Sequence, residues 1–257
     1  MPYSFDCENF KLGYKESPVE SPVLWESHCH ARFEMIGVLE GDVSITLEGK
    51  SYRLTEHQVA VISPLSYHTL HANKRGRYRR ITALFDTAFI PEPLCNRLSG
   101  NTGIAIFRAQ QLERLKKVCL ESDLAFYRPL AEALMLQTLY ECVETAPIGP
   151  AIETDEFLQK TLDYIDRHLT QKILLDDLAR LTSRSKSSFC HLFEEKMQIS
   201  PKQYILQKRL AIAAKLMQDG LPPTAAALRV GYENYSNFYR VYQKHFGKAP
   251  TRRKGKA

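Results

Sequence analysis

The sequence lacks the long apolar run that would place the chain in a membrane. No stretch of its 257 residues approaches the roughly 20 apolar residues that a transmembrane helix needs. The first ten residues also lack the basic and then apolar pattern of a signal peptide. We therefore expect a cytoplasmic protein.

Paired cysteines are also missing. The six cysteines are scattered and include no Cys-x-x-Cys pair. This spacing argues against a disulfide framework and against a cysteine zinc site, so reduced thiols are expected. With 44% hydrophobic and 25% charged residues, the composition is that of a globular chain long enough for two modest domains.

The net charge of +6 is unevenly distributed along the chain. Residues 154–257 hold 19 Lys and Arg against 10 Asp and Glu, whereas residues 1–153 hold 16 against 19. A basic C-terminal half is typical of nucleic-acid binding, although solvated protein faces are often basic as well. Charge alone therefore permits a nucleic-acid interface without establishing one.

Short segments in the first third of the chain predict β-strands. They cover residues 35–39, 43–47, 52–54 and 59–62, and Gly-containing turns at residues 40–42 and 48–50 separate the first three. Several short strands at this spacing are typical of an antiparallel sandwich or barrel.

Between residues 111 and 145 the sequence changes to helix-forming residues. Leu136 and Tyr140 belong to one apolar stripe, whereas Leu130 and Leu134 lie off it. A helix that is apolar on more than one side must bury more than one face. Either it packs on its own barrel and on a second subunit, or it is buried within one monomer.

The C-terminal half predicts two helix-turn-helix units. The first has a short helix with Asp176 as its expected N-cap, followed by a recognition helix capped by Ser185. A longer helix from Pro201 to about Asp219 leads to the second unit, whose recognition helix Asn234 caps. This longer helix spans roughly 25 Å, so it could hold the two units about one DNA turn apart.

This pattern resembles the signature of the AraC/XylS family of transcription regulators. The matching residues are Leu178, Ala179, Ser185, Phe193, Ser200, Pro201, Tyr204, Arg209, Leu210, Ala213, Leu216, Gly231, Tyr232, Ser236, Phe238, Arg240, Phe246, Gly247 and Pro250. Two positions depart from it, because Gln198 stands where the family usually has Gly and Ala226 where it usually has Ile. Both departures concern a turn or packing rather than base contacts.

The resemblance implies that the exposed face of each recognition helix reads DNA base edges. The implied DNA-binding residues are Lys186, Ser187, Cys190, His191, Tyr235, Ser236, Asn237, Tyr239 and Arg240. Arg and Asn suit guanine and adenine edges, so the second unit is better equipped for direct readout. The alternative is that Ser236 and Asn237 only assist capping and that Arg240 forms a local ion pair.

The N-terminal half resembles the cupins. His28, His30 and Glu34, followed by Gly41, reproduce the spacing of the first cupin motif, and His68 lies in a stretch similar to the second. In metal-binding cupins such residues hold iron, manganese or zinc. Sensor domains of AraC/XylS regulators often keep them without a metal, and the second motif here lacks its glycines. We therefore expect these four residues to line an effector pocket, with no metal or other cofactor.

The sequence does not identify the effector. A small barrel can enclose one small ligand. The basic stretch over residues 74–80 is compatible with an anionic effector, but a solvated loop and edge strand explain it at least as well.

These features predict an α+β chain with an N-terminal cupin-like antiparallel β-barrel and a C-terminal all-α domain. The expected segments are an effector-sensing domain at 1–90, a helical dimerisation segment at 91–146, a linker at 147–152 and the DNA-binding domain at 153–257. The expected function is effector-dependent control of transcription by a homodimer that is not an enzyme. Its expected partners are double-stranded DNA, a small-molecule effector and RNA polymerase. The competing hypothesis is a metal-dependent cupin enzyme fused to a DNA-binding domain.

Overall fold

The computed structural model describes residues 4–21, 23–24, 28–99, 104–145 and 153–251. The chain divides into two compact units, and the boundary lies between Thr154 and Asp155, with Ser27–Ala31 grouped with the second unit. The linker expected at residues 147–152 lies outside the described residues. No helix in the described ranges is long and apolar enough to cross a membrane.

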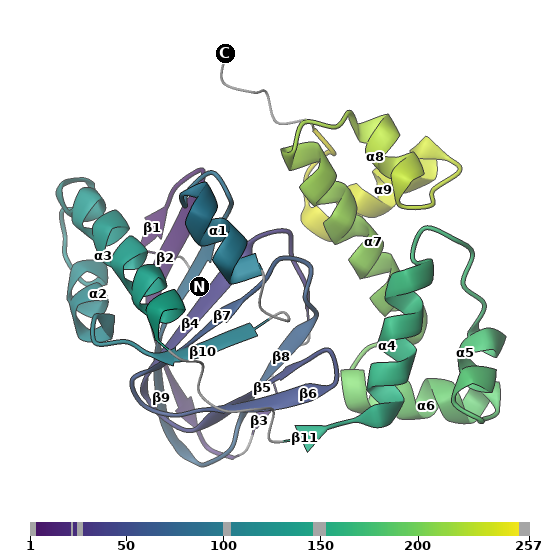
Figure 1. Ribbon diagram of the computed structural model, residues 1–257, viewed down its shortest axis with the longest axis horizontal. Coiled ribbons are helices and arrows are strands. Elements are labelled where there is room, and N and C mark those ends of the chain that lie inside the picture. Colours follow the sequence, from purple (N-terminus) through teal and green to yellow (C-terminus); the bar gives the residue numbers. More distant parts are fainter. Residues whose placement is uncertain (1–3, 22, 25–27, 100–103, 146–152, 252–257) are drawn as a thin grey trace. The chain divides into compact units, whose positions relative to one another are not determined.

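Antiparallel strands form two sheets in the first unit (Figure 1). The larger sheet has the order β1 (Phe5–Asp6), β2 (Phe10–Val19), β9 (Gly76–Phe85), β4 (Phe33–Glu40), β7 (Gln58–Ile62) and β10 (Ile104–Arg108). The smaller sheet has the order β11 (Glu153–Thr154), β6 (Lys50–Leu54), β5 (Val43–Leu47), β8 (His68–Ala72) and β3 (Val23–Leu24). The four strands expected in the first third are thus present as β4 to β7.

The two sheets pack face to face through one apolar cluster. It contains Ile36, Val38 and Tyr78 from the larger sheet and Val43 and Ile45 from the smaller one. Residues of β2 and β9 alternate between this inner cluster and the opposite face of the larger sheet, as the period of two in a strand requires. We call the face that meets the smaller sheet the inner face.

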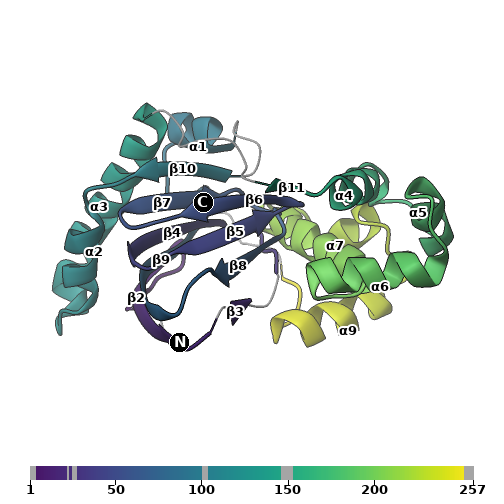
Figure 2. The same cartoon turned by 90° about the horizontal axis from the view of Figure 1, so that it is seen from below.

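Three helices cover the outer face of the larger sheet, namely α1 (Glu92–Ser99), α2 (Leu112–Cys119) and α3 (Leu124–Glu144). Figures 1 and 2 show them gathered on that side of the first unit. Asp123 caps α3 by accepting a hydrogen bond from the Phe126 amide at 3.0 Å. The segment over residues 91–146 is therefore not helical throughout, because β10 lies within it and pairs with β7.

The second unit is all helical, as expected. Its helices are α4 (Glu156–His168), α5 (Leu175–Leu181), α6 (Lys186–Met197), α7 (Pro201–Gln218), α8 (Pro223–Arg229) and α9 (Tyr235–Phe246). The side chains of Ser185 and Asn234 cap α6 and α9 as predicted. The expected N-cap Asp176 is wrong, since α5 begins at Leu175 and Leu174 holds the cap position. Asp176 lies in the first turn, where the helix dipole favours a negative charge.

The end of α4 connects the two helix-turn-helix units. Arg209 of α7 donates hydrogen bonds to the carbonyl oxygens of Leu169 at 2.8 Å and Gln171 at 2.6 Å. Gly231, in the turn between α8 and α9, has a positive φ of 85°, and a Cβ there would lie 2.8 Å from the Thr170 carbonyl oxygen. The backbone after α4 therefore contacts both α7 and the second turn.

Candidate functional site

The first recognition helix, α6, presents a short polar surface. Lys186, Ser187 and His191 are exposed, whereas Cys190 is half-buried. The Lys186 ammonium lies 3.0 Å from an Asp176 carboxylate oxygen, so it has a local partner at the helix start. Burial and then the nearby Glu194 carboxylate raise the pKa of the Cys190 thiol. This thiol is therefore a weak hydrogen-bond donor at neutral pH.

The second recognition helix, α9, presents a surface with larger side chains. Tyr235, Ser236, Asn237, Tyr239 and Arg240 are all exposed. The Tyr235 and Tyr239 rings lie 6.3 Å apart, edge to face. Arg240 donates a hydrogen bond to the Asn237 side-chain oxygen at 3.3 Å, which leaves the Asn237 amide nitrogen and the remaining guanidinium donors for another partner.

Each recognition face is supported by aromatic residues behind it. Phe189 and Phe193 of α6 are fully buried, and the Phe193 ring packs edge to face on Tyr204. Phe238 of α9 is fully buried beside the Tyr242 ring at 5.4 Å. Two such units, each with a rigidly packed recognition helix, define a DNA-binding protein of the helix-turn-helix class.

The four residues expected to line an effector pocket come together. The potential ligand atoms of His28, His30, Glu34 and His68 all lie within 4.8 Å of one another. The His68 Nε2 atom is hydrogen-bonded to a Glu34 carboxylate oxygen at 2.8 Å, and the Nδ1 atom to the Ser66 carbonyl oxygen at 3.0 Å. Burial lowers the pKa of His68, but the Glu34 carboxylate and the Ser66 carbonyl outweigh burial, so the pKa lies above its ordinary value.

This donor set fits a transition-metal ion by chemistry and by size. Three imidazoles and one carboxylate are ligands that iron, manganese or zinc accepts. Bonds of about 2.1 Å to one ion place tetrahedral ligand atoms roughly 3.4 Å apart, which is compatible with the compact set observed. The same four residues can also bind the polar group of an organic ligand, because histidine and glutamate both form hydrogen bonds.

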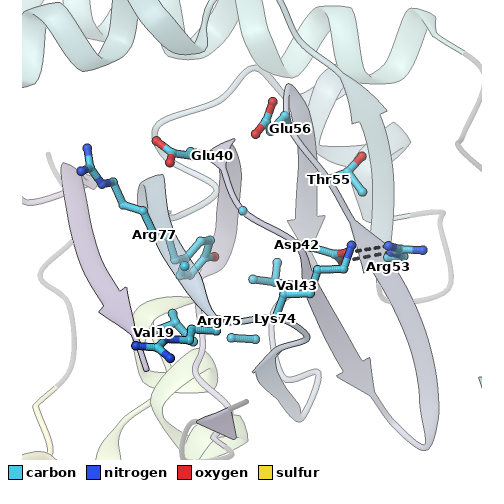
Figure 3. Close-up of a pocket in the computed structure, with 14 residues that line it drawn as sticks. Val19, Glu40, Asp42, Val43, Arg53, Thr55, Glu56, Lys74, Arg75 and Arg77 are labelled. Carbon is cyan, nitrogen blue, oxygen red and sulfur yellow. Dashed lines mark hydrogen bonds and ion pairs between the residues drawn. The ribbon is translucent and has the colours of Figure 1, made fainter. Parts of the chain in front are cut away.

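A cavity of about 590 Å³ lies at one end of the sandwich (Figure 3). Its lining includes Val19, Val43 and Tyr78 of the inner face together with charged residues of the adjoining turns. Asp42 accepts a hydrogen bond from Arg53 at 3.0 Å, and the Lys74 ammonium lies 3.3 Å from the same carboxylate. These contacts lower the pKa of Asp42 well below its usual range.

Two cations lie on the inner face. The sequence points to Arg80 only as part of the basic stretch over residues 74–80 and does not point to Lys15 at all. Lys15 of β2 and Arg80 of β9 are direct cross-strand partners, and both are half-buried. The pattern of β2 hides this, since its apolar residues Phe10, Leu12 and Tyr14 face the helices. A reader of the sequence assigns the opposite, polar face to solvent.

The comparisons with known proteins agree with the geometry of the second unit. A family model described as a helix-turn-helix domain matches residues 178–254. The probable transcriptional regulator LumQ of Photobacterium leiognathi is 33% identical over 91 residues, which are 35% of this chain and 37% of LumQ. The HTH-type transcriptional regulator YdiP of Escherichia coli is 32% identical over 101 residues, 39% of this chain and 33% of YdiP. The chain therefore spans about a third of the length of these curated relatives.

A third relative has a solved structure. It is a probable AraC family transcriptional regulator from Rhodopseudomonas palustris, with 30% sequence identity over 38% of this chain and 93% of its own, at a TM-score of 0.35. The family model confirms the helix-turn-helix domain that the C-terminal sequence predicts.

Proposed function

We propose that this protein is a transcription regulator that binds DNA through both helix-turn-helix units and responds to a small molecule held by its N-terminal sandwich. The observation that carries the proposal is the presence of two complete units, each with an exposed recognition helix, on one basic domain. A ligand can shift the equilibrium between two conformations of such a protein only if it binds one of them more tightly than the other. The resulting coupling free energy is typically about 1–3 kcal/mol.

The DNA interface in this proposal consists of residues on the outer faces of α6 and α9, all exposed except the half-buried Cys190. On α6 these are Lys186, Ser187, Cys190 and His191, and on α9 they are Tyr235, Ser236, Asn237, Tyr239 and Arg240. Lys186 is suited to a phosphate, since it lies at the N-terminus of α6. Arg240 and Asn237 are suited to base edges.

We further propose that the protein acts as a homodimer in the cytoplasm, with RNA polymerase as a further partner. The outer side of α3 carries Phe126, Leu130, Ala133, Gln137 and Tyr140 at alternating spacings of four and three residues, and all five are exposed. We call this set the α3 stripe. Phe126 is 72% exposed and Tyr140 43% exposed, which is unusual for apolar side chains without a partner.

The second candidate function is metal-dependent chemistry in the sandwich, and the compact set of His28, His30, Glu34 and His68 favours it. A bound metal would supply Lewis-acid chemistry, and the three histidines and the glutamate would hold it. The relatives are named as regulators, so catalysis is the secondary proposal. Metal analysis of the purified full chain, with a His68→Ala variant as control, distinguishes the candidates.

Selection from a random duplex library with the full chain tests the main proposal. We expect enrichment of a site with two conserved blocks about one helical turn apart, because each protomer carries two recognition helices. Recovery of a library without any enriched sequence would show that the protein does not read DNA sequence. A single enriched block would show that only one unit reads bases.

A further inference from the structure

The inner face of the larger sheet carries two cations where a sandwich interior is usually apolar. Lys15 and Arg80 are directly opposite each other on β2 and β9. Val19 and Tyr78 lie on the same face of the same strands and belong to the cluster between the sheets. Since residues two apart on a strand share a face, Lys15 and Arg80 both point toward the inside.

The charge of Lys15 is not balanced by another described residue. Like charges on directly opposed residues destabilise a pair of strands. Lys15 forms no hydrogen bond or ion pair with any other described residue. Its pKa is lowered by burial and then by the charge of Arg80, while the charge of Glu34 opposes the shift. Glu34 already accepts a hydrogen bond from His68. The inner face therefore holds a half-buried ammonium group, that of Lys15, without a carboxylate partner among the described residues.

Neighbouring groups hold the guanidinium in place and add a donor. The Arg80 guanidinium carbon lies 4.5 Å from the centre of the Tyr78 ring, and Arg80 donates to the Ser17 hydroxyl at 3.4 Å. The hydroxyl oxygen of Thr82, two residues along the same face, is buried without a hydrogen-bond partner. Arginine, lysine and a hydroxyl are the donors that bind carboxylate and phosphate groups.

The end of this tract lies beside an opening. Val19 and Tyr78 line the cavity in Figure 3. The next residues on the same face are Ser17 and Lys15 on β2 and Arg80 on β9. We propose that the sandwich binds an anionic small molecule, with its carboxylate or phosphate between Lys15 and Arg80. That this anion is the effector rests on the function proposed above.

The test measures the thermal unfolding of the full chain at fixed ionic strength, with hexanoate, inorganic phosphate or neutral hexanamide added. A ligand that binds only the folded state raises Tm as its concentration rises. We expect hexanoate or phosphate to raise Tm and hexanamide to leave it unchanged. The arm that responds identifies the carboxylate or the phosphate as the preferred group.

Variants assign the effect to the two cations. Lys15→Met and Arg80→Met should each weaken the anion-dependent shift about tenfold or more, because a charged hydrogen-bond partner is lost. The control is Arg108→Met at the end of β10, which is exposed and does not line the cavity; it should leave the shift unchanged. Equal shifts in wild type and Lys15→Met, or no shift with either anion, would overturn the proposal.

The ligand-free protein supplies a second measurement that needs no probe. Lys15→Met removes the repulsion from Arg80 and keeps the aliphatic stem, so Tm should rise without any anion present. A fall in Tm would show that the Lys15 charge stabilises the fold, and the proposal would fail. Neither measurement involves DNA. If the anion binds but leaves the affinity for DNA unchanged, the anion is not the effector, whereas the proposed binding site still stands.

Discussion

At the scale of single residues, the two recognition helices end in the same backbone conformation but with different residue types. Each ends in a residue of left-handed conformation, Gln198 with φ of 57° after α6 and Gly247 with φ of 68° after α9. A residue with a Cβ costs about 1–2 kcal/mol in this conformation, whereas glycine adopts it without strain. The side-chain amide of Gln198 donates a hydrogen bond to the Glu195 carbonyl oxygen at 2.6 Å, but this contact is exposed and offsets little of the strain.

We therefore predict that Gln198→Gly stabilises the protein. The free energy of unfolding should rise by about 0.5–1 kcal/mol, since the relief of strain exceeds the entropy that glycine adds to the unfolded chain. Urea denaturation of the full chain measures this change. The matched control is Gly247→Gln, which should lower the free energy of unfolding by a similar amount because only the backbone conformation opposes it. Two changes of the same sign would contradict the argument.

A second prediction concerns Arg240. Arg240→Ala should weaken binding to the selected duplex by about 1–3 kcal/mol while sparing a scrambled duplex, if the guanidinium contacts a guanine edge. Lys186→Ala should weaken binding to both duplexes alike, because a phosphate contact carries no sequence information. Binding curves at one salt concentration compare the two variants.

The two variants also test the alternative role of Arg240. An Arg240→Ala protein that keeps its Tm but loses equal affinity for both duplexes would show that this residue only positions the backbone. The hydrogen bond from Arg240 to Asn237 is compatible with either role, since it leaves donors of both side chains available.

Much of the second unit was predictable at this scale because caps are local. Ser185, Ser200 and Asn234 stand directly before apolar periods, and a side-chain oxygen that accepts from an amide three residues on needs nothing distant. Asp176 misled the prediction for the same reason, since an acid in the first turn resembles an N-cap in sequence.

At the scale of secondary-structure elements, α3 shows where sequence reasoning stops. Its period predicts a helix with apolar residues on several sides, and the structure buries Leu134 and Leu139 while it leaves Leu130 and Tyr140 exposed. The helical period gives the directions of the side chains around the helix axis relative to one another. The packing of α3 on the larger sheet decides which of these directions faces inward. The same limit applies to β9, where Arg80 is directed inward and Arg77 outward.

The α3 stripe gives a third prediction. Leu130→Glu should convert the homodimer to a monomer at micromolar concentration, because a charge placed in an apolar contact loses its hydration. Sedimentation velocity measures the change. Arg128→Glu adds an acid to the same helix away from the stripe and should leave the dimer intact. A wild-type chain that is already monomeric would refute the assignment.

The contact between the end of α4 and the second turn gives a fourth prediction. Gly231→Ala should destabilise the DNA-binding unit by about 2–4 kcal/mol, since it combines a left-handed conformation with a close approach to the Thr170 carbonyl oxygen. Urea denaturation of the full chain measures the loss. Gly220→Ala has a positive φ of 98° but no neighbour within 4 Å, so it should cost only the backbone strain.

At the scale of the whole molecule, the chain divides where its charge changes sign. Residues 155–257 form a compact unit and hold most of the net positive charge. We predict that a fragment of residues 153–257 binds duplex DNA with a steep salt dependence. Affinity should fall on the order of a thousandfold between about 50 and 200 mM salt, because several phosphate contacts release counterions.

Fluorescence anisotropy with a labelled duplex measures this dependence. Affinity that stays constant over the salt range would exclude the basic unit as a clamp on the DNA backbone. The same fragment should sediment as a monomer, since α3 lies in the first unit. A dimeric fragment would move the subunit contact to the second unit.

The unequal faces of α6 and α9 give the molecule a direction. On the DNA interface proposed above, the first unit offers serine, cysteine and histidine and the second offers tyrosine, asparagine and arginine. We therefore expect one protomer to contact two unlike sequences in a fixed order. We predict a target that is not a palindrome and that the protomer binds in one orientation only. Reversing a single such site beside a promoter leaves the base pairs unchanged but turns the bound protein around. Polarity along the DNA is thus encoded within one chain, before any second copy is added.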